Sequence, residues 1–256
     1  DKADVWLKVS GIKIILIILG TLAVTKIARM ILNRIFRVFL QAGLDVEMKK
    51  RADTLSSLAR NIISTVILGI AFIIILEEFG IDIGPILAAA GIVGLAVGFG
   101  AQHLVQDIIS GFFILLEDQL RMGDVVEIGG KRGLGERVTI RMTILRDING
   151  SVHFVRNGMI DVVTNMTKDY AYYLFDIGVA YRENIDEVMN IMRKSEEQLR
   201  LDESLKDDIL EPLEIMGLDK FADSAVIIRA RLKTKPNKQW RVGREYNRLL
   251  KINFDE

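Results

Sequence analysis

The sequence contains no cysteine and only two histidines, His103 and His153. The lack of cysteine excludes disulfide scaffolds, thiolate zinc sites and thiol nucleophiles, and two histidines are too few for a histidine-rich metal centre. A charge excess is also missing, because 34 basic residues balance 34 acidic ones in a chain of 256. Nucleic-acid binders usually carry a basic excess. We therefore expect no metal, no cofactor and no nucleic-acid partner.

Apolar residues are abundant instead. Half of the residues are hydrophobic, and the mean hydropathy is +0.27 although 27% of the residues are charged. The first 117 residues hold three runs without Asp, Glu, Lys or Arg: Ile14–Thr25, Asn61–Leu76 and Ile83–Gln106. A helix that crosses a bilayer needs about 20 apolar residues. We predict three membrane helices, at about residues 5–32, 59–79 and 83–117, the first two including residues that flank their runs.

The charges between these runs predict the orientation in the membrane. The connection from the first run to the second is basic, with Arg29, Arg34, Arg37, Lys49, Lys50, Arg51 and Arg60. The next connection carries only Glu77, Glu78 and Asp82. Short basic loops stay in the cytoplasm, so we expect a multi-pass protein of the inner (plasma) membrane with its N-terminus outside and everything after residue 117 inside. Contact with anionic lipid headgroups is a second role open to the basic cluster.

The third run has its small residues on two sides of one helix. At 3.6 residues per turn, Leu95 and Phe99 lie within about 40° of each other. One ridge of small residues flanks them with Ala89, Ala96 and Gly100, and another with Ala90, Gly94 and Gly98. Small residues let helices approach closely inside a membrane.

Ridges on both flanks allow the helix to pack against a copy on each side and to close a ring. Leu95 and Phe99 would then point inward as a hydrophobic constriction, which can stop ions by dewetting. Gln102 continues this stripe as a polar pore-lining residue. The alternative is that the small residues only pack the helix against its neighbours within one subunit.

After Gln102 the pattern becomes amphipathic, which suits a helix lying along the membrane interface. We therefore expect a bend between Gln102 and Gly111, although glycine marks helix breaks only statistically. One interpretation of His103, near this bend, is a pH-sensitive group. A polar residue placed where the helix leaves the membrane is the simpler interpretation of His103.

The segment Gly94–Ile128, GLAVGFGAQHLVQDIISGFFILLEDQLRMGDVVEI, resembles the small-conductance mechanosensitive channel (MscS-like) family. The resemblance runs from about residue 50 to the end of the chain. Its motifs continue downstream in Gly130-x-x-Gly133, Arg141-x-Thr143, Leu145-Arg146 and Asn157-Gly158. It implies a homoheptamer whose third helix lines the pore above a vestibule of cytoplasmic domains. It also places the family's two pore-constriction positions on Leu95 and Phe99.

The sequence departs from the family in four places. His103 stands where some members have a kink glycine, so Gly111 is the better candidate for the bend. Arg156 stands where a proline usually precedes Asn-Gly, and Gly135 replaces a common valine. The chain stops at Glu256, before the family's Pro-containing final segment, so we expect the last strand and the small C-terminal barrel to be absent.

The remaining sequence predicts a β domain at residues 118–167 and an α+β domain at residues 168–256. The β domain is expected to contain strands at 124–128, 138–146 and 152–156, with a type I′ hairpin at Asn149-Gly150. The α+β domain is expected to contain strands at 172–181 and 225–234 and helices at 184–200, 205–216 and 238–252. The fold class is therefore a membrane all-α region of three transmembrane helices, followed by cytoplasmic β and α+β domains.

No catalytic constellation is visible, so the protein is not expected to be an enzyme. The acidic pairs Glu196-Glu197 and Asp207-Asp208 are interpreted as solvated charges, and His153 has no nucleophile near it in sequence. The main hypothesis is a channel that opens under membrane tension and releases ions and small osmolytes on hypo-osmotic shock. Its partners would be membrane lipids, other copies of the chain and the permeating solutes. The alternative is a membrane-anchored interaction module that conducts nothing.

Overall fold

The computed structural model describes the backbone of residues 2–40 and 46–256 and the side chains of residues 10–35 and 49–256. The side chain of Arg37, in the basic cluster, lies outside this range. The chain forms two compact units, of which one ends at Phe99 and the other begins at Gly100. The division therefore falls inside a helix, and not at residue 117.

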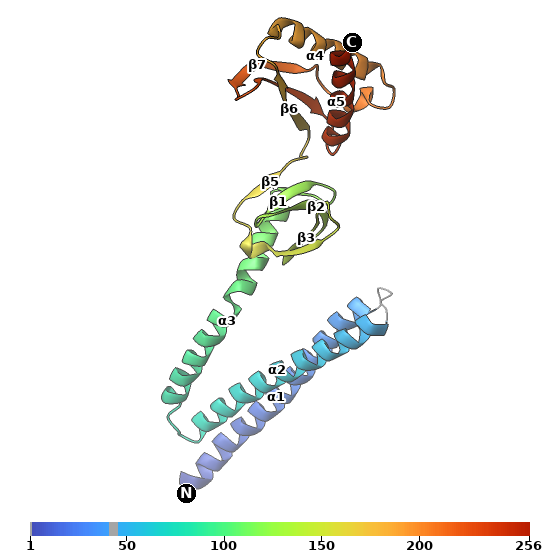
Figure 1. The fold of residues 1–256 in the computed structure, drawn as a ribbon. Coiled ribbons are helices and arrows are strands. Elements are labelled where there is room, and N and C mark those ends of the chain that lie inside the picture. Colours follow the sequence, from blue (N-terminus) through green and yellow to red (C-terminus); the bar gives the residue numbers. More distant parts are fainter. Residues whose placement is uncertain (1, 41–45) are drawn as a thin grey trace. The chain divides into compact units, whose positions relative to one another are not determined.

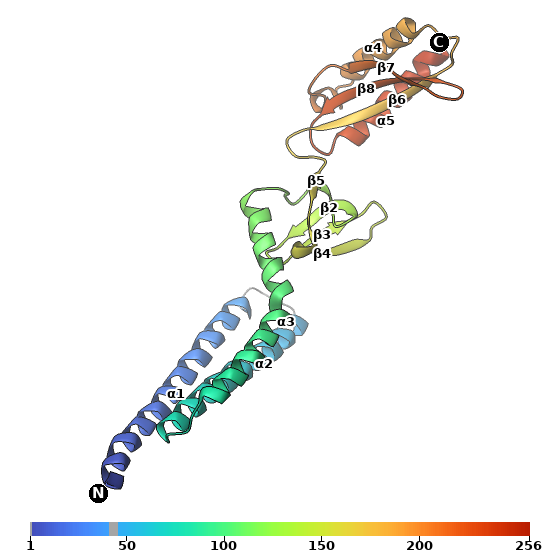
Figure 2. The same ribbon diagram turned by 90° about the vertical axis from the view of Figure 1, so that its left-hand side faces the viewer.

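Helices α1 (Lys2–Leu40) and α2 (Val46–Glu78) run antiparallel to each other (Figures 1 and 2). Side-chain contacts join them along their length, among them Lys13 with Glu78 at 3.0 Å, Arg29 with Ser64 at 3.2 Å and Arg60 with Asn33 at 2.9 Å. Both helices are longer than predicted, because hydropathy detects only the apolar part of a helix. The segment before residue 59 continues the second helix with good helix formers such as Ala, Leu, Lys and Arg.

Helix α3 (Gly84–Leu116) begins where Asp82 accepts a hydrogen bond from the Gly84 backbone N–H at 2.9 Å, with Pro85 in the first turn. Proline is well suited to this position, where its missing N–H needs no partner. The helix is continuous through Gln102 and Gly111, so the predicted bend does not interrupt its hydrogen bonding; a smoother bend stays a prediction. Among the described residues, three segments are long and apolar enough to cross a membrane: Ser10–Ile35, Lys49–Glu78 and Gly84–Leu116.

The β domain is one antiparallel five-stranded sheet with strand order β4-β3-β2-β1-β5. The strands are β1 (Val125–Ile128), β2 (Lys131–Val138), β3 (Met142–Arg146), β4 (Val152–Arg156) and β5 (Val163–Asn165). A short 3-10 turn, Asn157–Met159, follows β4. The core of this domain includes Val126, Ile128 and Leu145, and Ile114 of α3 packs into it. The end of α3 therefore belongs to the β domain.

Two predictions within this sheet are wrong. The single strand expected at 138–146 is two strands, because Thr139 closes a tight turn: its hydroxyl donates to the Met142 carbonyl at 2.7 Å and accepts from the Met142 N–H at 3.0 Å. The hairpin at Asn149-Gly150 is not type I′, which requires positive φ at both residues. Only Gly150 has positive φ, at 87°, and its N–H donates to the Asp147 carbonyl at 3.0 Å.

The C-terminal domain has a three-stranded antiparallel sheet, order β6-β8-β7, with two helices on one face. Its elements are β6 (Ala171–Val179), α4 (Ile185–Leu201), the 3-10 turn Lys206–Asp208, β7 (Glu214–Phe221), β8 (Val226–Thr234) and α5 (Gln239–Asp255). Burial alternates strictly along β8, as expected for a strand with one covered face. Val188 and Met192 of α4 pack in this core, as the helical pattern predicted.

The prediction of a short helix at 205–216 is wrong. Only Lys206–Asp208 is helical, and Glu214–Phe221 forms a strand that pairs with β8. Pro212 lies inside the expected helix, where it would remove a backbone hydrogen bond and clash with the preceding turn.

Two carboxylates interpreted as solvated are in fact buried. Glu196 is 6% exposed and accepts a hydrogen bond from Arg200, and Asp208 is 9% exposed and pairs with Lys238 at 3.3 Å. Their neighbours Glu197 and Asp207 are exposed, as predicted.

The other face of the C-terminal sheet carries an ionic ladder. Its ion pairs are Asp176–Arg229 at 2.7 Å, Asp219–Arg229 at 3.1 Å, Glu214–Arg231 at 2.6 Å and Glu211–Lys233 at 2.6 Å. The hydrogen bond from Arg229 lowers the pKa of Asp176. The guanidinium of Arg231 lies 4.4 Å from the centre of the Tyr172 ring. Acid and base therefore alternate across this face.

Candidate functional site

The first half of α3 presents apolar side chains that the rest of its unit leaves uncovered. Every described residue from Leu87 to Gly100 is exposed, including Leu95 at 64% and Phe99 at 73%. Transferring so much apolar surface to water is unfavourable, at about 25 cal/mol per Å². This surface therefore needs lipid or other protein to cover it.

The glycines of this stretch are not required by packing within one chain. At Gly91, Gly94 and Gly98, no atom of the described residues beyond the helix's own nearby backbone lies within 4 Å of the place where a Cβ would be. A small residue at these positions therefore leaves room for something outside the single chain.

All the residues predicted for the pore lie on α3. The packing positions Ala89, Ala90, Gly94, Ala96, Gly98 and Gly100 are exposed on it. Gln102 and His103 are exposed as well, one turn further along. Gly111 differs from them because it is buried against the β domain.

Asp107 connects α3 to the β domain. Its side chain is 2% exposed, and its Oδ1 accepts a hydrogen bond from the Gly158 backbone N–H at 3.0 Å. The neighbouring Gln106 donates from its side-chain amide to the Gly158 carbonyl at 2.9 Å. Both backbone groups of Gly158 are thus held by consecutive residues of one helix. A Cβ on residue 158 would lie 2.6 Å from Asp107 Oδ1, so only glycine fits there without displacing the carboxylate.

Gly111, one turn beyond Asp107, makes a second close contact with the sheet. A Cβ at this position would lie 1.9 Å from the Ile140 carbonyl oxygen and 2.3 Å from Asn157 Nδ2. The buried Asn157 amide donates to the Thr139 carbonyl at 2.8 Å and accepts from the Thr143 hydroxyl at 3.0 Å. The glycine therefore has a packing role in this helix, independent of any bend.

The second oxygen of the Asp107 carboxylate has weaker contacts. Oδ2 is buried, accepts no hydrogen bond from the described residues, and lies 3.7 Å from Arg141 Nε. Buried carboxylates are costly unless they are paired or hydrogen-bonded. The Gly158 N–H and the nearby guanidinium are therefore what keep this charge stable at the junction, which we call the α3–sheet junction (Gln106, Asp107, Gly111, Asn157 and Gly158).

Sequence reasoning identified Asn157-Gly158 as a family motif and Gln106 and Asp107 only as polar residues of an amphipathic helix. It did not predict that Gln106-Asp107 contacts Asn157-Gly158. The sequence did contain a signal for a buried contact at Asp107, because this residue stands among apolar residues of one helix. An aspartate is rarely fully buried without a partner. The partner itself is a backbone N–H some 50 positions away, and no side-chain pattern reveals such a group.

Three family models, each for a different part of the mechanosensitive ion channels, match the chain. They are the transmembrane helices 2/3 at residues 61–102, the beta-domain at residues 103–168 and the MscS C-terminal domain at residues 174–256. The small-conductance mechanosensitive channel of Caldanaerobacter subterraneus subsp. tengcongensis is 34% identical over 252 residues, which are 97% of this chain and 88% of that protein. The chain belongs to the mechanosensitive ion channel family. The predicted resemblance and the predicted fold class are thereby confirmed.

Other members of the family differ in size. The moderate conductance mechanosensitive channel YbiO of Escherichia coli is 32% identical over 205 residues, 80% of this chain but 28% of that protein. The crystal structure of Helicobacter pylori MscS in a closed state has the same fold, with a TM-score of 0.71 at 20% identity over 96% of this chain and 92% of that one. This is a family of membrane channels and not of enzymes, and the helices of the present chain identify it as a membrane protein.

Proposed function

We propose that this chain forms a tension-gated pore whose closed state is a hydrophobic constriction made by Leu95 and Phe99. The observation that carries the proposal is the uncovered stretch of α3, where exposed apolar side chains stand among glycines at which an added Cβ would meet no atom of the described residues beyond the helix's own nearby backbone. Copies of α3 packed through the two small ridges would cover these ridges and direct Leu95 and Phe99 to a common axis. Family membership supports a ring of seven copies.

The gating mechanism is a shift between two populations. Membrane tension favours the state that occupies more area in the bilayer plane, and a ligand or force changes a population only through such a difference between states. In the closed state the apolar rings exclude water, so that ions cannot pass. In the wider state the rings fill with water and conduct. Gln102, one turn beyond Phe99, would line the conducting path.

The α3–sheet junction would transmit movement between the pore helix and the β domain. Asp107 and Gln106 hold both backbone groups of Gly158, and Gly111 allows the helix backbone to approach the Ile140 carbonyl. A displacement of α3 must therefore move the sheet or break these contacts. We propose that a bend near His103 or Gly111 accompanies such a displacement.

The basic residues at one end of the α1–α2 pair support an N-terminus outside the inner membrane and a cytoplasmic location for the β and C-terminal domains. Release of ions and small osmolytes on hypo-osmotic shock would be the physiological result of opening under tension.

A membrane anchor without conduction requires neither exposed small ridges nor an oligomer. The mass of the detergent-solubilised protein separates the two functions, because an anchor can be monomeric.

Pressure-clamp recording from the purified protein in liposomes tests the gate. Leu95→Ser and Phe99→Ser are expected to open at lower tension than the unchanged protein, since a polar ring wets more easily. Val93→Ser is the matched control, because it makes a similar apolar-to-polar change about 160° away from Leu95 around the helix. Equal thresholds in all four proteins would refute the assignment of Leu95 and Phe99, and the absence of any current would refute the channel itself.

A further inference from the structure

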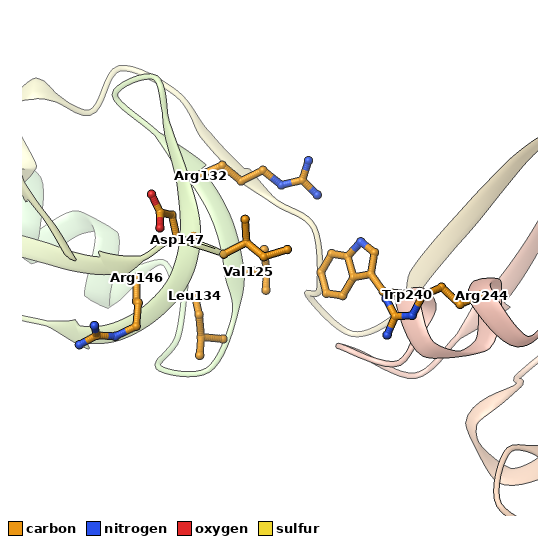
Figure 3. Close-up of a pocket in the computed structure, with 9 residues that line it drawn as sticks. Val125, Arg132, Leu134, Arg146, Asp147, Trp240 and Arg244 are labelled. Atoms are coloured by element: carbon orange, nitrogen blue, oxygen red, sulfur yellow. The ribbon is translucent and has the colours of Figure 1, made fainter. Parts of the chain in front are cut away.

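An open cleft of about 540 Å³ lies within the second unit, between the five-stranded sheet and the start of α5 (Figure 3). Strands β1, β2 and β3 contribute one wall, and the first two turns of α5 contribute Trp240 and Arg244. Pockets for small molecules have volumes of about 300–1,000 Å³ and combine apolar walls with a few polar groups. This cleft has both properties and takes no part in the pore or the α3–sheet junction.

Cationic groups dominate the polar lining of the cleft. Arg146 is already engaged, since it bonds to Glu136 and donates to the Gly150 carbonyl at 2.8 Å. Arg132 and Arg244 are exposed, and within the described part of the chain neither has a carboxylate within 4.0 Å. Two guanidinium groups at the cleft are therefore available for an anion.

The single acidic residue among the lining residues, Asp147, does not compete for these arginines. Its Oδ1 accepts hydrogen bonds from the backbone N–H groups of Asn149 and Ser151, both at 2.9 Å, and its Oδ2 lies 3.1 Å from His153 Nε2. The carboxylate is thus occupied within its own hairpin turn. The charged residues of the lining, three arginines and one aspartate, therefore give the cleft a net positive charge.

The start of α5 adds to this positive potential. Helix α5 has no side-chain cap and no acidic residue in its first turn, so its first N–H groups remain a site that favours negative charge. Trp240 belongs to that first turn and is half-buried. Figure 3 shows its indole ring directed across the cleft toward the Arg132 side chain, with Arg244 beside it.

The apolar part of the lining determines what kind of anion fits. Val125 and Leu134 lie on the opposite wall from Trp240. An indole face binds flat rings such as nucleic-acid bases by stacking. Inorganic anions would leave this apolar surface unused. The lining therefore suits a ligand that has both a planar ring and a negative charge.

We propose that this cleft binds a small planar anion of the nucleoside phosphate class, with its ring against Trp240 and its phosphate between Arg132 and Arg244. Arginine forms paired, charge-assisted hydrogen bonds with phosphate oxygens, which are stronger than neutral ones. Because the cleft is lined by the β sheet and by α5, a bound ligand would hold the two domains together. The proposal does not depend on the pore and can fail or succeed without it.

The chain contains only two tryptophans, Trp6 and Trp240. A Trp6→Phe variant of this chain therefore reports on Trp240 alone. We expect saturable quenching of its fluorescence on titration with AMP, excited at the red edge of the indole absorption. Adenosine, which lacks the phosphate, and inorganic phosphate, which lacks the ring, are each expected to bind at least tenfold more weakly.

Two variants in this background test the arginines. Arg132→Gln combined with Arg244→Gln is expected to weaken AMP binding at least tenfold, and Arg137→Gln, on the same strand as Arg132 but outside the cleft, is expected to leave it unchanged. Equilibrium dialysis with labelled AMP checks the affinities independently of fluorescence. Equal binding by the double variant, or competition by inorganic phosphate as effective as AMP, would overturn the proposal. So would protection of Trp240 from iodide quenching in the assembled protein, since another copy would then occupy the cleft.

Discussion

Asp107 of helix α3 accepts a hydrogen bond at 3.0 Å from the backbone N–H of Gly158, while the preceding Gln106 binds the carbonyl of the same glycine. The contact depends on the main chain of residue 158 and on the absence of a side chain there. It fixes one position of the helix against one position of the sheet. The stability of the β domain and the placement of α3 should therefore depend on each other.

Replacing Asp107 tests this contact directly. Asp107→Leu removes the acceptor and leaves the partly buried Gly158 N–H without this partner, a loss of about 1–3 kcal/mol in the free energy of unfolding. Asp107→Asn keeps an acceptor oxygen and should cost less. Hydrogen exchange of the Gly158 amide is the measurement: it should accelerate strongly in Asp107→Leu and only weakly in Asp107→Asn. Unchanged protection in Asp107→Leu would show that another group holds this amide.

Gly111→Ala distinguishes packing from bending. A methyl group at residue 111 would lie 1.9 Å from the Ile140 carbonyl, so the helix or the sheet must move, at a cost of about 1–3 kcal/mol or more. If the glycine served only a bend, alanine would stabilise the helix by up to about 1 kcal/mol. Urea unfolding in detergent reports the sign of the change. Gly69→Ala on α2 is the control, because its Cβ would enter open space.

Gly94→Leu tests the small ridges of α3. Leucine favours the helix more than glycine does, and its Cβ would meet no atom of the described residues beyond the helix's own nearby backbone, so the isolated subunit should keep its helical content. In a ring of copies, the larger side chain would separate neighbouring helices. We expect a smaller particle mass in detergent, or a loss of current if the ring survives. Val93→Leu, between the ridges, is the control; an identical effect of the two substitutions would refute the ridge assignment.

The ionic ladder of the C-terminal sheet predicts acid sensitivity. Arg229 lowers the pKa of Asp176 in the folded protein, so this carboxylate adds stability above the ordinary aspartate pKa of about 3.9 and loses it as the pH falls toward the lowered value. Asp176→Asn should therefore destabilise the protein at neutral pH and flatten its dependence on acidic pH. Urea unfolding over a series of pH values measures both effects. The exposed Asp223, for which the described structure shows no ion pair, provides the control Asp223→Asn, expected to change neither.

Hydropathy and residue periodicity predicted the helices and the two soluble domains because those signals are local. The errors occur where distant contacts decide the structure. No strand was predicted at 131–137, yet β2 lies there, and a Cβ at Gly133 would lie 2.5 Å from the Arg146 carbonyl on β3. The segment 214–216 was predicted as helix, but pairing with β8 makes it a strand. Strand pairing depends on partners that a window of neighbouring residues does not include.

The same reasoning applies to the candidate site. Leu95 and Phe99 could be proposed from helical spacing because the relevant feature is one face of one helix. The α3–sheet junction could not, since it joins a side chain of α3 to the main chain of Gly158. The prediction for Glu196 was also wrong. As a charged residue beside Glu197 it was expected to be exposed to solvent, whereas its side chain is buried and accepts a hydrogen bond from Arg200.

The alternation of acids and bases on the uncovered face of the C-terminal sheet has a consequence for solutes that diffuse past it. Arg229, Arg231 and Lys233 of the ladder each lie within 3.1 Å of a carboxylate, so the fields of these pairs largely cancel within a few ångströms. Physiological salt screens the remainder over about 8 Å. This face of the sheet should therefore exert only weak electrostatic forces on cations, anions and neutral osmolytes that diffuse past it.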